Sequence, residues 1–528
     1  MSSNDDSLKE LARSIGIPEE SFIPYGHDMA KLDVKISVNS QGKLILVTAM
    51  TPTTYGEGKT TTCIGLAQGI KKLGKKVTVC LREPSMGPVF GMKGGATGGG
   101  KSKIEPSNKI NLMFTGDFSA VSSAHNLLST AISNHIYFGN KLRIDPSRIQ
   151  FPRTMDMNDR SLRNIILSVS ESNDSIIYRD RFVITPASEL MAILGLSLSI
   201  EDMKNRIGNI LIGFSYDMNP VYCKDLNVQN AMAAILVDAL KPNLVRTTEG
   251  VPALVHTGPF ANIAHGTSSL LSTKIAMQLS EYVVIEAGFG SDLGAEKFMN
   301  IVSRVGNVDV SAVVLVVTIR GIKELGKNSN EVVATGFQNV IQHVENIRSF
   351  GYDPVVCLNV FASDSESEIK LCEDLFEKYE FNWSLSEAFA KGGDGTIQLA
   401  EKVLNACATI KPLYTYDFKD PTKVKIEKIC KRVYGCSTVK YSKSALDTIS
   451  IIEKFGFSNL PICVAKSQYS FSGTDDKNTI MIREIKINSG AGFIVPISGN
   501  IMTMPGLPRE PAYLNIDVDK NGKITGIS

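Results

Sequence analysis

The chain has 528 residues, of which 43% are hydrophobic, 21% charged and 7% aromatic. At roughly 150 residues per domain, this length predicts about three domains, and the composition excludes a disordered or fibrous protein. The 56 basic and 54 acidic residues give a formal net charge of +2, so no overall field favours nucleic acid or an anionic membrane. We therefore expect any anion to be bound at a local site.

The N-terminal residues MSSNDDSLKELARSIG predict neither a signal peptide nor a transit peptide, because acidic residues come early and no apolar run is present. The longest apolar stretches, such as residues 310–319, fall short of the roughly 20 residues needed to cross a bilayer. The nine cysteines form no C-x-x-C pair and do not cluster with the six histidines, which argues against a zinc site or a disulfide framework. We expect a cytoplasmic protein that binds neither membrane nor nucleic acid.

The first strong structural signal is a strand, a loop and a helix near the N-terminus. Residues 42–50, GKLILVTAM, predict a buried strand, and residues 59–72 carry apolar side chains at helical spacing. Residues 75–83, KKVTVCLRE, predict a second strand. Together they form a βαβ unit whose loop lies at the carboxyl end of the first strand, where open parallel sheets bind ligands.

Further continuous apolar runs predict buried parallel strands, because half-buried antiparallel strands would alternate polar and apolar residues. These runs lie at residues 209–214, 252–257, 282–288, 312–318 and 354–360. The pattern predicts an α/β fold with a P-loop NTPase-like parallel sheet flanked by helices, together with additional smaller α/β domains.

The C-terminal part has a different character. We expect a linker around residues 411–421, helical segments over 422–456, and then strand-like pieces with Gly and Pro turns. The tail IDVDKNGKITGI is similar to a calcium loop, but Ser528 stands where that loop requires a bidentate Glu. We therefore favour a hairpin with an Asn-Gly turn.

The loop TPTTYGEGKTTT, residues 51–62, ends like the phosphate-binding motif G-x-x-x-x-G-K-[ST]. Its two glycines, Gly56 and Gly58, allow a tight turn whose N–H groups can point at phosphate oxygens, and Lys59 can reach the β and γ phosphates. Thr60 or Thr61 can ligate Mg²⁺ at the start of the helix. A turn that merely connects strand and helix would leave the Lys and the three Thr unexplained.

The same loop departs from the motif at its first position, where Thr53 replaces glycine. None of the functions above needs a glycine there, so we still predict an ATP site. The residues expected to bind ATP are Thr53, Thr54, Tyr55, Gly56, Glu57, Gly58, Lys59, Thr60 and Thr61.

A second glycine-rich segment, residues 81–103, follows the second predicted strand. Its glycines indicate backbone packed closely against something, or a mobile lid, and a flexible linker would not account for the interleaved Arg, Glu, Lys and Phe. Arg82 and Glu83 are expected at the carboxyl end of a strand neighbouring the strand of the phosphate loop, facing the same crevice. Arg82 could there stabilise charge on a transferring phosphoryl group or an acyl phosphate.

Seven colinear blocks closely resemble the formate–tetrahydrofolate ligase family, also called 10-formyltetrahydrofolate synthetases. They are the two segments above and INLMFTGDFSAVSSAHNLLSTAISNHIYFGN (110–140), GPFANIAHG (258–266), EAGFGSDLGAEKF (286–298), LPICVAKSQYSFS (460–472) and GAGFIVPISGNIMTMPGLPREPAYLNIDVDKNGKITG (490–526). Bifunctional and trifunctional relatives carry a dehydrogenase–cyclohydrolase segment before the ligase. The chain has no room for one, so the resemblance is to the monofunctional form.

The resemblance implies a two-step reaction in which ATP phosphorylates formate to formyl phosphate, and tetrahydrofolate attacks this intermediate to give 10-formyltetrahydrofolate, ADP and phosphate. Lys59 would bind the phosphates and Arg82 would hold formyl phosphate. Glu83 and Asp117 would organise the site, Asp117 by positioning the folate amine. The alternative for Asp117 is a carboxylate that caps a loop.

Two histidines, His125 and His265, lie inside matching blocks, either as site residues or as hydrogen-bonded structural histidines. The family stacks the pterin of folate between aromatic side chains, which here would be Phe361 and Phe389. Phe389 stands where the family usually has Trp, which keeps a stacking face but makes it smaller and removes the indole donor. The alternative is that both phenylalanines belong to the core.

The chain departs from the family's pattern at Thr54 and Tyr55 in the loop and at Leu325 in VVTIRGIKELGKN, residues 316–328. None of these departures removes a residue assigned to phosphate or formyl transfer, so the resemblance implies a divergent but active member. A non-catalytic relative that binds nucleotide or folate, and a P-loop ATPase of the partner-switching kind, remain the alternatives. The blocks outside the loop count against the ATPase.

The resemblance also implies Mg²⁺ with ATP, a monovalent cation such as K⁺ or ammonium as activator, and a homotetramer. The expected partners are the small molecules formate, tetrahydrofolate and ATP. We expect a nucleotide-binding P-loop domain with the formyl phosphate site over residues 1–270. A second α/β domain over 271–415 would contribute the aromatics that stack on folate, and a smaller α+β domain would span 416–528.

Overall fold

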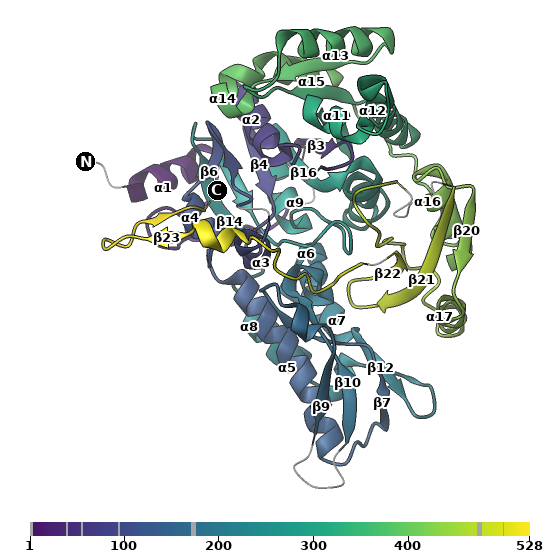
Figure 1. Cartoon of the computed structure of the whole chain (residues 1–528). Helices are drawn as coiled ribbons and strands as arrows, with labels where there is room; N and C mark the ends of the chain where they lie inside the picture. Colours follow the sequence, from purple (N-terminus) through teal and green to yellow (C-terminus); the bar gives the residue numbers. More distant parts are fainter. Residues whose placement is uncertain are drawn as a thin grey trace.

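The computed structural model describes residues 4–37, 41–53, 56–92, 95–169, 176–471, 478–499 and 501–527. Its centre is a large mixed sheet flanked by helices (Figure 1). In spatial order the main path of the sheet is β1 (Phe22–Pro24), β2 (Ala30–Leu32), β14 (Asn243–Thr247), β15 (Pro252–Val255), β4 (Val77–Leu81), β16 (Tyr282–Gly290), β3 (Lys43–Ala49), β17 (Val310–Val317), β18 (Val355–Asn359) and β19 (Trp383–Ser386). Off this path, β6 (Ser102–Glu105) pairs with β14 and with β5 (Gly98–Gly99). Neighbours from β15 to β19 are all parallel, whereas β14 pairs antiparallel with β15 and β2.

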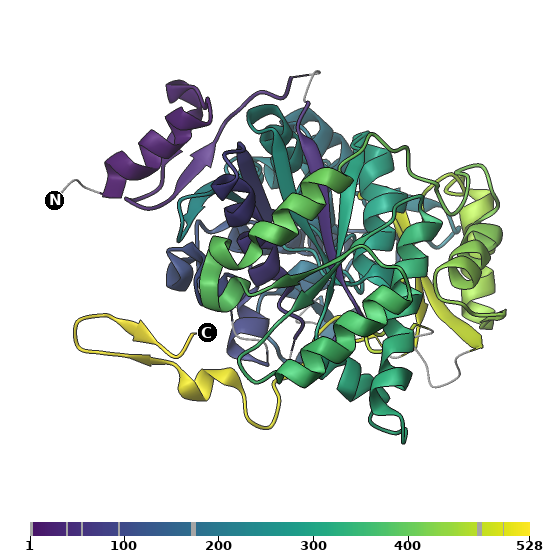
Figure 2. The same cartoon turned by 90° about the horizontal axis from the view of Figure 1, so that it is seen from above.

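The sheet is buried on both faces, because alternate residues of each central strand enter two separate cores. Ile45 and Val47 of β3 pack with α2 (Lys59–Lys72) and α15 (Ile397–Ala406). Leu44 and Leu46 face the opposite core, which includes α9 (Leu270–Leu279) and α12 (Val332–Ser349). Figure 2 shows helices on both sides of the central strands. Burial on both faces is the physical reason that these strands read as continuous apolar runs.

Most predicted elements are confirmed. The strand expected at 42–50 is β3, the strand expected at 75–83 is β4, and the helix expected at 59–72 is α2. The runs at 252–257, 282–288, 312–318 and 354–360 correspond to β15, β16, β17 and β18.

One strand prediction is wrong in direction and place. The run at 209–214 forms β12 (Leu211–Ser215), which pairs antiparallel with β13 (Pro220–Tyr222) and β7 (Ile144–Ile149) in a separate three-stranded sheet. Every residue of β12 is buried, since neighbouring elements cover both of its faces. A continuous apolar run therefore reports burial on both faces and not the direction of pairing.

The lower part of the molecule in Figure 1 combines helices with small sheets. The helices are α5 (Asp117–Tyr137), α6 (Glu189–Leu196), α7 (Ile200–Gly208) and α8 (Gln229–Leu236). The remaining strands here are β8 (Arg153–Met155) with β11 (Phe182–Ile184), and β9 (Ile165–Ser168) with β10 (Ile177–Asp180).

A small C-terminal unit follows the main sheet. β20 (Thr438–Tyr441), β21 (Thr479–Asn488) and β22 (Phe493–Ser498) form a three-stranded sheet, and α16 (Thr422–Arg432) and α17 (Lys443–Lys454) precede and follow β20. Helices were predicted over 422–456, but the short strand between them was not. Among the described residues no helix is long and apolar enough to cross a membrane, and all nine cysteines, each in a described segment, are free thiols.

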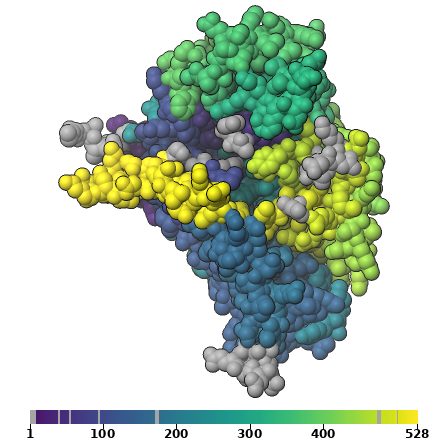
Figure 3. Space-filling model, in the orientation of Figure 1, coloured from purple at the N-terminus to yellow at the C-terminus, as the bar shows by residue number. Residues whose placement is uncertain are grey.

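The last residues, 501–527, form a C-terminal strap that crosses the front of the molecule (yellow in Figures 1 and 3). Thr503 accepts a backbone hydrogen bond from Ile184 at 2.8 Å, and Ala512 donates one to Gly91 at 2.7 Å. The strap ends in a hairpin of β23 (Asp517–Val518) and β24 (Ile524–Thr525), which confirms the predicted Asn-Gly turn. The Asp519 carboxylate accepts from the backbone N–H groups of the turn, so it closes the hairpin.

Candidate functional site

The phosphate loop connects β3 to the first turn of α2. Gly56 and Gly58 adopt left-handed conformations, with φ of +74° and +70°. A Cβ atom at Gly58 would also clash with the Asn359 side chain, so both backbone geometry and space require glycine there. Because α2 begins at Lys59, its first N–H groups point toward the loop, where an anion is stabilised. Thr54 and Tyr55 lie outside the described residues.

Thr53 and Glu57 hold the loop closed. One Glu57 carboxylate oxygen accepts from the backbone N–H of Thr53 at 2.8 Å and from its hydroxyl at 2.9 Å. The other accepts from the Thr318 hydroxyl at 2.5 Å. Both residues are buried, so the threonine in place of the motif's first glycine shapes the loop from within. These two side chains support the loop, which leaves the backbone N–H groups and Lys59 to meet a ligand.

Arg82 is linked to the phosphate loop by a carboxylate on the strand that lies between β3 and β4. The expectation that Arg82 follows a strand adjacent to β3 is wrong, because β16 lies between β3 and β4. Glu286 on β16 spans this gap: it accepts from the Thr60 hydroxyl at 2.7 Å and lies 3.5 Å from Arg82 Nε. The buried Glu286 carboxylate therefore brings the start of α2 and the end of β4 into one site.

Lys59 is surrounded by charged side chains of both signs. Burial lowers the pKa of Lys59, the carboxylates of Glu286 and Glu57 oppose that shift, and Arg82 adds to it. Two cations, the loop N–H groups and a hydroxyl at Thr60 suit a polyphosphate chain. The Thr60 hydroxyl and the Glu286 carboxylate are oxygen donors of the kind that Mg²⁺ prefers. The described residues contain no group of three or more His, Cys, Asp or Glu that could hold a metal ion.

Glu83 and Asp117 lie close together in the interior. The two oxygens of Asp117 accept from Lys31 Nζ and from Asn243 Nδ2, each at 2.8 Å. The side chains of Lys31 and Asp117 are only 6% and 4% exposed. Burial raises the pKa of Glu83, the charge of Asp117 raises it further, and Lys31 opposes both. Asp117 thus forms a buried ion pair, and it does not cap the loop before α5, whose capping residue is Gly116.

The two candidate aromatics follow the carboxyl ends of the neighbouring strands β18 and β19. The guanidinium carbon of Arg320 lies 3.8 Å from the centroid of the Phe361 ring, which covers one face of that ring. Phe389 lies in α14 (Ala388–Lys391), and its side chain is 55% exposed. Its carbonyl accepts from the backbone N–H of Lys101 at 2.9 Å. The exposure of Phe389 rules out the alternative that it is a core residue.

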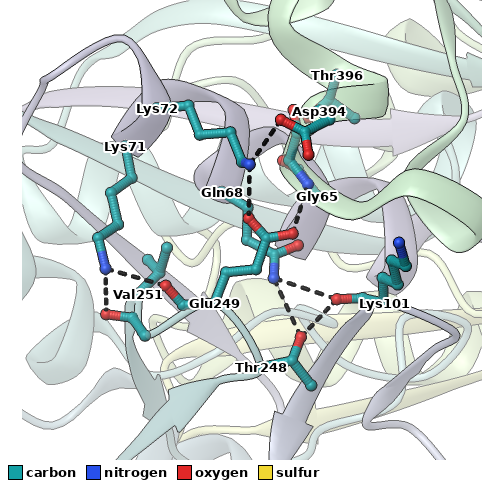
Figure 4. A network of polar contacts seen from close by, with 12 residues as sticks. Gly65, Gln68, Lys71, Lys72, Lys101, Thr248, Glu249, Val251, Asp394 and Thr396 are labelled. Carbon is teal, nitrogen blue, oxygen red and sulfur yellow. Dashed lines mark hydrogen bonds and ion pairs between the residues drawn. The ribbon is translucent and has the colours of Figure 1, made fainter.

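The segment that carries Phe389 is fastened by the polar network of Figure 4. A carboxylate oxygen of Glu249 accepts from the backbone N–H of Gly393 at 2.9 Å. Lys72 lies 3.7 Å from Glu249 and donates to Asp394 at 2.6 Å. Gln68 adds a link from α2 to the carbonyl of Lys101 at 3.2 Å. The network ties residues 392–394 to α2 and to the turn before β15. It therefore helps to hold the neighbouring Phe389 in position beside the glycine-rich segment.

The two histidines in the blocks that resemble the family differ in their surroundings. His125 Nε2 is 2.7 Å from the carbonyl of Pro152, and the ring stacks on Phe151 at 4.1 Å, so His125 is a hydrogen-bonded structural residue. Burial lowers its pKa to about 4. Burial lowers the pKa of His265 to about 3, and Arg82 adds to the shift. Both imidazoles are therefore neutral near pH 7.

Three residues of the site were not identified from the sequence. Glu286 gave one usable signal, a lone carboxylate inside the apolar run YVVIEAG. Burying an unpaired carboxylate is costly, so such a residue should have indicated a partner at the sheet edge. Arg320 and Glu249 gave no local signal, because their partners lie far away in the chain.

Comparisons with known proteins agree with one another. Residues 1–528 match the family described as formate–tetrahydrofolate ligase. The formate–tetrahydrofolate ligase of Thermoplasma volcanium is 54% identical over 98% of this chain and 99% of its own length. Proteins of the same name from Picrophilus torridus and Thermotoga maritima are 50% and 48% identical; the matches cover 98% and 99% of this chain, and 100% and 99% of those proteins.

Proposed function

Because the chain belongs to the formate–tetrahydrofolate ligase family, it is a ligase, and we propose that it joins formate to tetrahydrofolate at the expense of ATP. The products would be 10-formyltetrahydrofolate, ADP and phosphate, with formyl phosphate as intermediate. The observation that carries the proposal is the cluster of Lys59, Thr60 and Arg82 around Glu286, beside two aromatics at the same sheet edge.

In the proposed first step, a formate oxygen attacks the γ-phosphorus of ATP and the bond to ADP breaks. The segment from β3 to α2 works here as a P-loop in the manner of P-loop NTPases. Lys59 and the first N–H groups of α2 hold the phosphates, and Arg82 stabilises the charge that develops on the transferred group. Glu286 sets the positions of Thr60 and Arg82, so the groups are oriented before the substrates react.

In the proposed second step, the folate amine attacks the carbonyl carbon of formyl phosphate, phosphate leaves with the bonding electrons, and the amine proton passes to the departing phosphate. Phe361 and Phe389 stack on the pterin and hold the amine in place. Glu83 and Asp117 lie in the interior and support the site without touching the substrates. Both oxygens of Asp117 are already hydrogen-bonded, so we propose that it acts by fixing Lys31 beside Glu83.

Mg²⁺ enters as part of the substrate Mg-ATP, and the hydroxyls of Thr60 and Thr61 are the groups that would meet it. The ion would neutralise phosphate charge there. The family resemblance further implies activation by K⁺ or ammonium and assembly as a homotetramer. Omission of K⁺ from the assay tests the first, and sedimentation equilibrium tests the second.

The direct test is product formation by the purified chain with Mg²⁺, K⁺, ATP, formate and tetrahydrofolate. We expect 10-formyltetrahydrofolate, and we expect ADP release to require both formate and tetrahydrofolate. Absence of product would make the proposal wrong. Retained ATP binding without turnover, not restored by Phe389→Trp, would instead indicate a non-catalytic relative.

Glu286→Gln tests the link between the loop and Arg82. The amide keeps an oxygen for the Thr60 hydroxyl but loses the negative charge that faces Lys59 and Arg82. Because charged hydrogen-bond partners contribute about 1.5–3 kcal/mol, we expect kcat to fall about 10- to 100-fold. Steady-state kinetics with all three substrates measure the change. Glu281→Gln, at an exposed residue just before the same strand, is the matched control and should keep wild-type kcat.

Glu249→Ala tests the mounting of Phe389. Loss of the hydrogen bond from Gly393 should let the segment move, and one such bond corresponds to about 1 kcal/mol, or about fivefold in affinity. We expect the KM for tetrahydrofolate to rise by that factor while the KM for ATP stays the same. Glu401→Ala removes an exposed acid of α15 outside this network and should leave both values within about twofold. An equal effect on both KM values would contradict this role.

A further inference from the structure

Arg320 touches both halves of the site. It lies in the first turn of α11 (Ile319–Gly326), directly after β17. One terminal nitrogen donates to the carbonyl of Gly56 in the phosphate loop at 2.8 Å. The guanidinium carbon lies 3.8 Å from the ring centroid of Phe361, a stacking distance. A single rigid group thus joins the loop assigned to phosphate with the ring assigned to the pterin.

Two more hydrogen bonds fasten the loop to the same strand ends. The Thr318 hydroxyl, at the end of β17, donates to the Glu57 carboxylate at 2.5 Å. The Asn359 amide, at the end of β18, donates to the Glu57 carbonyl at 3.2 Å. Glu57 is therefore held by two residues that lie two positions before Arg320 and Phe361 in the chain. Movement of the loop must be transmitted to those two residues.

The two aromatics are supported in different ways. Arg320 covers one face of Phe361, so a flat ligand must stack on the opposite face, and the guanidinium sets the tilt of the ring. Phe389 instead rests on the glycine-rich segment, where a Cβ atom at Gly100 would clash with its backbone carbonyl. Of these two rings, it is Phe361 that is joined to the phosphate loop through an arginine.

We propose that Arg320 couples the two substrate sites, so that nucleotide binding tightens the binding of tetrahydrofolate. This inference rests on the proposed function. Phosphate bound to the loop N–H groups fixes the Gly56 peptide, which fixes the guanidinium and with it the Phe361 ring. The ring is then ordered before the pterin arrives, which lowers the entropy cost of stacking. Because coupling is reciprocal, tetrahydrofolate tightens nucleotide binding by the same factor.

Calorimetry on the full chain tests the coupling. The Kd of tetrahydrofolate is measured with and without saturating Mg-ADP, and formate is omitted so that no turnover occurs. For the wild type we expect Mg-ADP to lower this Kd by about fivefold or more. Arg320→Gln should reduce the ratio to about one. Arg320→Lys should do the same, because lysine keeps the charge but lacks the planar group that stacks and donates at once.

Two further variants separate coupling from general damage. Phe361→Leu keeps the hydrogen bond from Arg320 to Gly56. It should also bring the ratio of the two tetrahydrofolate Kd values to about one. Arg304→Gln is the matched control: its guanidinium carbon lies 3.6 Å from the Phe418 centroid and it donates to the carbonyl of Tyr416, so it loses the same kind of stack outside the site. It should keep the wild-type ratio.

The outcomes are distinct. A wild-type ratio of one, or an unchanged ratio in Arg320→Gln, would overturn the coupling and leave the proposed function intact. Failure of the wild type to bind tetrahydrofolate at all would overturn the proposed function and the coupling together. An equal loss in Arg304→Gln would show that any arginine–aromatic stack affects the ratio, which would also overturn the role of Arg320.

Discussion

Lys59→Ala should lower formate-dependent ADP release by at least about a hundredfold, because the variant loses a cation placed where the phosphates are expected to bind. The carboxylates of Glu286 and Glu57 favour the charged form of this lysine, whereas burial and the charge of Arg82 disfavour it and lower its pKa. Its removal leaves one cation, Arg82, with two carboxylates in the cluster. The same variant should bind Mg-ATP more weakly, which calorimetry measures directly.

Lys71→Ala is the matched control, since Lys71 lies at the far end of the same helix and donates to the backbone carbonyls of Glu249 and Gly250. It should retain wild-type turnover within about twofold, as expected for a surface substitution. Persistence of activity in Lys59→Ala would show that the loop is not the phosphate site. A loss that vanishes at high ATP concentration would assign Lys59 to binding alone.

Asp117→Ala should destabilise the fold by about 3–5 kcal/mol, because it leaves Lys31 buried without its carboxylate. Asn243 would lose an acceptor at the same time. The free energy of unfolding in urea measures the effect. If Asp117 acted only on the folate amine, the variant would lose activity with little change in stability.

The double variant Lys31→Met with Asp117→Leu removes both charges. Replacing a buried ion pair by apolar side chains of similar volume is close to neutral, so the double variant should recover most of the lost stability. Asp217→Ala is the surface control: Asp217 pairs with Arg143 at 3.2 Å where both are exposed, and its loss should cost less than about 1 kcal/mol. Equal losses in Asp217→Ala and Asp117→Ala would contradict the buried-pair interpretation.

Local sequence patterns predicted those elements whose boundaries are set by neighbouring residues. The helix at 59–72 was predicted at its observed boundaries, since a glycine turn precedes it and apolar spacing runs through it. Strand order was not accessible in this way. Nothing in the sequence of β4 indicates that β16 inserts between it and β3, because pairing between strands about 200 residues apart depends on tertiary packing.

The site residues likewise divide into those that belong to one contiguous motif and those whose partners lie far away in the chain. Gly58, Lys59 and Thr60 belong to one contiguous motif and could be found from their spacing. Glu286 and Arg320 act through partners more than two hundred residues away, so no window of sequence contains both ends of either contact. Contiguous motifs therefore pointed to the loop that we propose as the phosphate site, whereas the residues that hold this loop in place could be found only from the three-dimensional fold.

The C-terminal strap has a consequence for the order in which the chain matures. Thr503 and Ala512 form backbone hydrogen bonds with Ile184 and Gly91, and Gly91 lies in the glycine-rich segment that also contains Arg82. Residues 503–512 follow every strand of the central sheet in the chain, so during synthesis the glycine-rich segment lacks part of its final contacts until the strap has been made. A nascent chain released before residue 503 should therefore contain the sheet but remain open to proteolysis around residues 81–103.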